Sequence, residues 1–105
     1  MGDAEKLEVR PVEVELGSLK ELPDNPHFMP SVMYRQLVEN LRADGVLTST
    51  PLVYRGIVLS GNHRVRAAVE AGIERAVVLE IVGELTEQRV RAISLSHNAI
   101  NGADD

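Results

Sequence analysis

Apolar residues alternate with polar residues near the N-terminus, and the alternation changes phase once. The apolar positions are first odd and then even, in the order Leu7, Val9, Val12, Val14 and Leu16. A period of two is typical of a half-buried strand, so we predict a strand over residues 7–16. The phase changes at Arg10-Pro11. Because proline has no N–H to donate to a β-ladder, we predict a bulge or an edge-strand break at Pro11.

Further along the chain, apolar residues recur with the period of a helix. These positions are Met33, Leu37, Val38 and Leu41. This spacing predicts an amphipathic helix, with Pro30 in its first turn and Gly45 directly after its last residue. Between the first strand and this helix, residues 18–22 are predicted to form one helical turn. Residues 23–26, Pro-Asp-Asn-Pro, are predicted to form a chain turn.

The middle of the chain predicts a hairpin and a second helix. Residues 51–54 and 57–59 are apolar and flank Arg55-Gly56, a dipeptide suited to a tight hairpin turn. The helix that follows starts near Asn62 and ends at Ala71-Gly72. The expected inward stripe of this helix is Val65, Ala68 and Val69.

The C-terminal part predicts one more strand and one more helix. Residues 76–82 form a nearly continuous apolar run, which is typical of a strand covered on both faces. The last helix should begin near Thr86 as its N-cap. Its expected core positions are Val90, Ile93 and Ile100, with His97 on the same stripe. Together the elements predict an α+β domain.

The junction between the hairpin and the second helix carries the strongest chemical signal. Its strand ends in Ser60-Gly61, and the helix opens with Asn62, His63 and Arg64. Unpaired N–H groups at a helix N-terminus attract anions, glycine allows close approach to the backbone, and arginine can add a forked cationic clamp. We predict a phosphate site here. The alternative is an ordinary strand-to-helix connection with Ser60 or Asn62 as N-cap.

Helical spacing separates the two arginines that follow this glycine. Arg66 lies about one turn after Asn62 and His63 and shares their face, whereas Arg64 points to the other side. Arg64 is in the first turn, where a long side chain can swing toward the anion. We therefore expect Arg64 to be the phosphate clamp and Arg66 to have a supporting role.

Residues 60–68, Ser-Gly-Asn-His-Arg-Val-Arg-Ala-Ala, resemble the second sequence box of the ParB/sulfiredoxin superfamily. In that box a Gly-x-[His/Arg]-Arg-x-x-Ala pattern opens a helix whose arginine contacts phosphate. The resemblance covers nearly the whole chain and implies one ParB-like domain over residues 1–105, an α+β fold with a small mixed sheet and flanking helices. Residues 1–5 and 102–105 are expected to be flexible. The implied nucleotide or phosphate ligands are Ser60, Gly61, Asn62, His63, Arg64, Arg66, Asn25 and Asn98.

Two departures from the superfamily pattern restrict the chemistry. Sulfiredoxins place a catalytic cysteine where this chain has Asn62, and the chain contains no cysteine, which excludes sulfiredoxin chemistry. ParB domains bind and hydrolyse CTP and complete the nucleotide and Mg²⁺ site with a third box, Glu-Asn-x-x-Arg. At that place Asn98 matches the box asparagine, but His97 replaces the glutamate and Asn101 the arginine. CTP or ATP with Mg²⁺ is therefore the implied cofactor, and its metal ligands are unassigned.

Charge and hydropathy narrow the class of partner. The formal net charge is −5, and most arginines are interleaved with glutamates, which predicts a mixed, solvated surface. Such a surface does not favour tight binding to duplex DNA, so nucleic acid is a possible but weak partner of the isolated domain. No apolar run reaches the length of a membrane span and no signal peptide is recognisable, which predicts a cytoplasmic protein. The oligomeric state is not predicted.

Several function classes follow from the resemblance. The leading one is a ParB-like nucleotide- or phosphate-binding domain that acts in DNA transactions of the partition or phage type. A ParB-like nuclease would use His63 as a general acid or base beside Arg64. A small-molecule kinase would need a carboxylate base, for which Glu21 and Asp24 are the candidates. A non-catalytic interaction module is the remaining alternative. Because the third box lacks its glutamate and arginine, we rank binding above catalysis.

Overall fold

The computed structural model describes residues 6–22 and 29–101, and the side chains among them up to residue 97. Its elements in chain order are β1 (Glu8–Glu15), the 3₁₀-helix η2 (Leu16–Ser18), β2 (Lys20–Glu21), α1 (Ser31–Asp44), β3 (Leu52–Tyr54), β4 (Ile57–Ser60), α2 (Asn62–Glu70), β5 (Arg75–Val82) and α3 (Glu87–Asn101). The predicted α+β class is confirmed. The predicted turn at residues 23–26, which contains Asn25, and the two chain ends lie outside the described residues.

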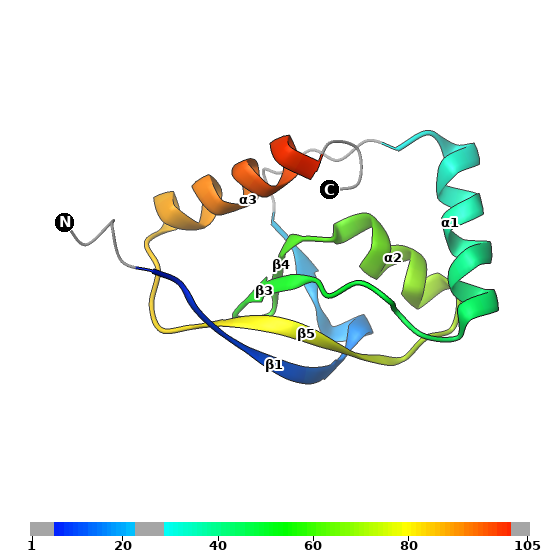
Figure 1. The fold of residues 1–105 in the computed structure, drawn as a ribbon, viewed down its shortest axis with the longest axis horizontal. Coiled ribbons are helices and arrows are strands. Elements are labelled where there is room, and N and C mark those ends of the chain that lie inside the picture. Colours follow the sequence, from blue (N-terminus) through cyan, green and yellow to red (C-terminus); the bar gives the residue numbers. More distant parts are fainter. Residues whose placement is uncertain (1–5, 23–28, 102–105) are drawn as a thin grey trace.

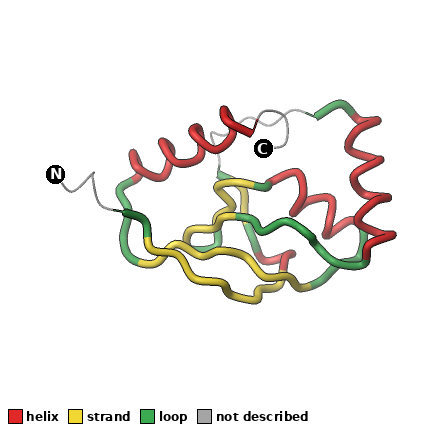
Figure 2. The backbone as a smooth tube through the Cα atoms, viewed as in Figure 1, coloured by secondary structure: helices red, strands yellow, loops and turns green. Residues whose placement is uncertain are grey.

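The strands form one mixed sheet in the order β1-β5-β3-β4-β2. The β1/β5 and β3/β4 pairs are antiparallel, whereas β3/β5 and β2/β4 are parallel. Figure 1 shows α3 over one end of the molecule and α1 with α2 at the other end. Figure 2 shows the same separation, with the strands lying below α3 in this view.

Two hydrophobic cores lie on opposite faces of the sheet. Val53 and Val78 belong to the core beneath α1 and α2, whereas Leu52 and Ile81 belong to the core beneath α3. Because successive side chains of a strand point to opposite faces, Leu52 and Val53 must face opposite sides of the sheet. Each helical layer therefore covers one face, at one end of the sheet.

The two cores explain the phase change in β1, and the predicted bulge at Pro11 is wrong. The β1/β5 register runs without a shift from Glu8↔Val82 to Glu15↔Arg75. The apolar positions switch parity because Leu7 packs on the α3 core and Val14 on the α1/α2 core. No bulge is needed for that exchange of faces.

The predicted edge-strand break at Pro11 is also absent, because β1 runs without interruption from Glu8 to Glu15. Pro11 is nevertheless tolerated because β1 is an edge strand. Pro11 lies opposite Leu79, and the N–H of Leu79 points away from β1, donating to Pro51 O at 2.9 Å. Opposite residues either exchange both ladder hydrogen bonds or exchange none. The nitrogen of Pro11 therefore faces the open edge of the sheet, where its missing N–H costs no ladder bond.

A register shift occurs instead between β3 and β4, directly before the candidate site. Leu52 pairs with Ser60 while Val53 pairs with Val58, which leaves Leu59 as the extra residue. The hairpin turn of this pair was predicted correctly. Arg55-Gly56 has φ of 50° and 82°, so both central residues are left-handed, as a type I′ turn requires.

Three further local predictions need correction. The expected helical turn at residues 18–22 is replaced by η2 and the short strand β2, because Lys20 N–H donates to Gly56 O at 2.9 Å and joins this segment to the sheet. Val69 is 45% exposed rather than part of the inward stripe, and Ala67 is buried in its place. Strand β5 is not covered on both faces throughout, since Val77 is 51% exposed.

The end of α1 and the start of α3 follow the sequence signals, whereas Pro30 is the N-cap of α1 rather than a residue of its first turn. Helix α1 ends at Gly45, which is left-handed and donates its N–H to Leu41 O at 2.9 Å. Thr86 Oγ1 accepts a hydrogen bond from Arg89 N at 3.0 Å, which confirms Thr86 as the N-cap of α3. No helix in residues 6–22 and 29–101 is long and apolar enough to cross a membrane.

Candidate functional site

The site is built on the junction of β4 and α2. Gly61 is the N-cap of α2 with φ 97° and ψ 23°, and no side-chain hydrogen bond caps the helix there. The alternative in which Ser60 or Asn62 is the N-cap is therefore wrong. A Cβ on Gly61 would lie 3.3 Å from Pro51 Cβ and 3.4 Å from Pro51 Cα. Both the backbone conformation and the contact with Pro51 require glycine at this position.

Asn62 and His63 lie inside the protein. Asn62 is 1% exposed, and its Nδ2 donates to Val58 O at 3.4 Å, a long hydrogen bond that ties α2 to β4. His63 is 4% exposed. Burial lowers the pKa of His63, and the nearby charge of Arg66 lowers it further, against the opposing effect of Glu21. His63 is therefore neutral at pH 7.

Arg66 points toward β2 and is held there. Its guanidinium forms an ion pair with Glu21, with Nε 3.1 Å from Oε2, and both side chains are about half exposed. Beside this pair, Tyr34 of α1 donates a hydrogen bond to Glu70 Oε1 at 2.9 Å. Burial and this hydrogen bond raise the pKa of Tyr34 to about 12. These contacts connect α1, α2 and β2 on the side of α2 that carries Arg66.

Arg64 points to the other side of α2, as helical spacing predicted. It lines a pocket of about 230 Å³ between α2 and α1. The other lining residues are Met29, Met33, Gln36, Leu37 and Asn40. Arg64 forms no ion pair with any residue that the structure describes.

The pocket wall opposite Arg64 was missed by the sequence analysis, and so was one buried polar residue. Met33, Gln36 and Asn40 recur at helical spacing on α1. The prediction of this helix used only its apolar positions, so the polar residues of the same face were not identified. Ser94 of α3 is 1% exposed. It lies four residues after Val90, so its place on the buried stripe was also predictable.

Of the remaining predicted site residues, Ser60 and His97 lie in the described part of the chain. Ser60 is half-buried at the end of β4. Helix α3, which carries His97 and Asn98, packs against β4. His97 is half-buried, whereas the side chain of Asn98 and the whole of Asn25 lie outside the described part. Among the described residues, no group of three or more histidine, aspartate or glutamate side chains could hold a metal ion.

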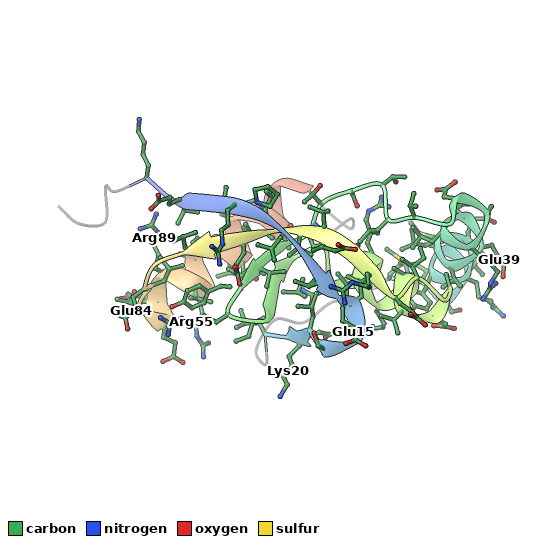
Figure 3. The ribbon with its side chains drawn as sticks, turned by 90° about the horizontal axis from the view of Figure 1, so that it is seen from below. Glu15, Lys20, Glu39, Arg55, Glu84 and Arg89 are labelled. Atoms are coloured by element: carbon green, nitrogen blue, oxygen red, sulfur yellow. The ribbon has the colours of Figure 1, made fainter. Side chains whose placement is uncertain are left out.

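Most other arginines pair with glutamates on the surface. The N···O distances are 3.1 Å for Arg10–Glu80, 3.5 Å for Arg75–Glu13 and 3.7 Å for Arg55–Glu84. Figure 3 shows Arg55 near Glu84 at one end of the molecule, with Glu39 at the other. Exposed pairs of this kind contribute little stability. They agree with the predicted mixed surface, whereas Arg35 and Arg64 form no ion pair with a described residue.

The burial of His63 predicts a specific pH dependence of stability. The unfolded chain binds a proton near pH 6.5, but the folded chain binds it only at lower pH. The free energy of unfolding should therefore fall as the pH drops below about 6.5, by at most about 1.4 kcal/mol per pH unit from this site. Urea denaturation between pH 7.5 and 5.0 measures the slope.

His63→Gln should reduce this slope, even though the substitution lowers stability at every pH. The matched control is His97→Gln, which changes a half-buried histidine on α3 and shows whether the loss of any histidine has the same effect on the slope. An unchanged slope in His63→Gln would show that other groups cause the acid sensitivity.

Comparisons with known proteins connect this fold to ParB. No protein-family model and no curated protein matches the chain. A solved Pnob8-like ParB-N domain matches with TM-score 0.71 and 16% sequence identity, over 96% of this chain and 41% of the other. The C-terminally truncated chromosome-partitioning protein ParB from Caulobacter crescentus, complexed with CTP-gamma-S, matches with TM-score 0.70 and 25% identity, over 87% of this chain and 53% of the other. This chain thus spans about half the length of these solved chains. It forms a ParB-like domain.

Proposed function

We propose that this ParB-like domain binds a nucleotide, with the phosphates at the N-terminus of α2. The observation that carries the proposal is the placement of Arg64. This arginine lies in the first turn of α2, lines a pocket and has no ion-pair partner among the described residues, whereas Arg66 is paired with Glu21. A helix N-terminus with an available guanidinium is suited to a phosphate group.

CTP is the first candidate ligand and ATP the second. The Caulobacter crescentus ParB that shares this fold is complexed with CTP-gamma-S, which supports a cytidine nucleotide. We propose that Mg²⁺ arrives with the nucleotide, because Mg²⁺ commonly binds substrate phosphates and retains several waters. The described residues contain no carboxylate cluster that would hold the ion by itself.

We propose binding rather than hydrolysis as the basic activity. A general acid or base must come within hydrogen-bond reach of the reacting group. His63 is 4% exposed, so its imidazole would reach a substrate only after a rearrangement. Glu21, the described carboxylate candidate for a kinase, is engaged by Arg66. These positions support neither the nuclease nor the kinase alternative.

The biological setting that we propose is a DNA transaction of the partition or phage type. The fold is that of ParB N-terminal domains. The net charge of −5 and the paired surface arginines favour a role for nucleotide binding over direct contact with duplex DNA by this domain.

Arg64→Ala should weaken nucleotide binding by about 1–3 kcal/mol, the range for losing a charge-assisted contact. Isothermal titration calorimetry with CTP, ATP and pyrophosphate, each with and without Mg²⁺, measures the loss. Arg66→Ala is the matched control, since it removes the same charge from the opposite side of α2. Equal losses in both variants, or none in Arg64→Ala, would remove Arg64 from the phosphate site.

A further inference from the structure

One edge of the sheet is a long, regular strand with no neighbour on its outer side among the described residues. β1 is the first strand in the sheet order, and its 8 residues pair with β5 without a register shift (Figure 1). The strand at the opposite edge, β2, has only 2 residues. A regular edge exposes a row of backbone N–H and C=O groups that can pair with a strand of another chain. β1 is therefore the edge through which two copies of this domain could pair.

The β1/β5 register shows which backbone groups face this open edge. Pro11 lies opposite Leu79, whose N–H donates to Pro51 O and not to β1. Residues of an antiparallel strand alternate between bonding to the neighbouring strand and pointing away from it. The backbone groups of Val9, Pro11 and Glu13 therefore face the open edge, and those of the residues between them bond to β5. Of these three residues, Pro11 alone has no N–H.

Charge does not protect this edge from a second copy of the chain. Two β1 strands could meet antiparallel with residue 11 of each copy at the centre. Residue 10 would then lie opposite residue 12, residue 9 opposite 13 and residue 8 opposite 14. Each pair combines a charged side chain with a valine, since residues 8, 10 and 13 are charged and residues 9, 12 and 14 are valines. Like charges directly opposite each other destabilise a strand pair, and residues 8–14 would form no such contact.

The proline at position 11 makes this pairing unfavourable. In an antiparallel pair centred on an outward-facing residue, that residue exchanges both of its hydrogen bonds with the same residue of the second copy. Pro11 cannot donate, so both central carbonyl oxygens would lack their donor. Sliding one strand by two residues places Pro11 opposite Val9 or Glu13, and each copy again lacks one donor. Backbone acceptors that are left unpaired inside a sheet are costly.

We propose that Pro11 keeps β1 unpaired and thereby prevents this domain from joining a second copy edge to edge. A second copy is the relevant partner because every copy presents the same edge with the same compatible side-chain pattern. Proline suits the position because it removes a donor only from the open side and leaves the ladder with β5 complete. The inference is independent of the proposed nucleotide binding, since β1 contributes no residue to the pocket that Arg64 lines.

Pro11→Thr tests the proposal, because threonine restores the N–H and favours strands. Self-association of this variant should be at least about tenfold tighter than that of the wild type, as expected for two recovered hydrogen bonds. Sedimentation equilibrium over a range of protein concentrations measures the difference. In the concentrated sample, hydrogen exchange of the amides at positions 9, 11 and 13 should be slower than in the dilute sample. A Pro11→Thr protein that associates no more tightly than the wild type would overturn the proposal.

The double variant Pro11→Thr/Glu13→Pro is the matched control. Its second substitution removes an outward-facing N–H from the same edge and sacrifices only the exposed ion pair of Glu13 with Arg75. The double variant should therefore return to the wild-type level of association. Val9→Pro, at another outward-facing position, provides the same control if Glu13→Pro prevents folding. Equal association of the single and double variants would show that the chains meet through another surface, which would overturn the role of this edge.

Discussion

Replacing Gly61 with alanine should destabilise the fold by about 2–4 kcal/mol, combining backbone strain with overpacking. The strain arises because φ is 97° at this residue, a value that an L-amino acid with a side chain rarely adopts. The overpacking arises because the new Cβ would meet the Cα and Cβ of Pro51 at 3.3–3.4 Å. Urea denaturation, read as a lower midpoint at unchanged slope, measures the loss.

Gly45→Ala is the matched control for this substitution. Gly45 is also left-handed, with φ 75°, but a Cβ there would meet nothing within 4 Å. The expected cost is about 1–2 kcal/mol from the backbone alone. If both variants lose the same stability, the contact with Pro51 contributes nothing. In that case the glycine is needed only for its conformation.

The sequence predicted turns and helix ends correctly where the residues that specify them are close together in the chain. The hairpin turn at Arg55-Gly56 and the end of α1 at Gly45 depend on left-handed backbone conformations that few residues adopt. The N-cap at Thr86 depends on one hydroxyl. Each of these predictions needed only residues within a few positions, and each is confirmed.

Predictions that needed the sheet order were less successful. The phase change in β1 was interpreted as a bulge because a single strand shows only its own pattern. In the structure, the exchange of faces reflects two cores formed by helices far along the chain. The assignment of residues 18–22 to a helical turn failed for the same reason. The two-residue strand β2 forms because it pairs with β4 and because Lys20 N–H donates to Gly56 O in the hairpin turn.

The candidate site shows the same division. Helical spacing alone placed Arg64 and Arg66 on different sides of α2, as observed. The burial of Asn62 and His63 was not predicted, because it depends on packing around α2 rather than on the sequence of α2 itself. The ion pair of Arg66 with Glu21 joins residues 45 positions apart, so no local sequence pattern predicts it. The sequence therefore identified the motif, whereas the structure distinguishes Arg64, which lines the pocket, from Arg66, which is paired with Glu21.

The strand that leads into the site also anchors α3. Leu59 is the extra residue of the irregular β3/β4 pairing and is 0% exposed. It belongs to the same core as Val90 and Ile93 of α3. Two positions later the chain reaches Gly61. The junction that we propose as the phosphate site therefore follows directly on a side chain that also forms the core beneath α3.

Leu59→Ala should cost about 2–5 kcal/mol of stability, the range for truncating a fully buried leucine in a core that relaxes only partly. Leu95→Ala is the control, because Leu95 lies on α3 but is 64% exposed, and its truncation should change stability by no more than about 0.5 kcal/mol. Urea denaturation compares the two variants, and CTP titration follows the site. The loss of stability should be accompanied by weaker CTP binding if the junction needs the core beneath it. A destabilised Leu59→Ala protein with wild-type affinity, measured where it remains folded, would show instead that Gly61 and Pro51 position the site without help from α3.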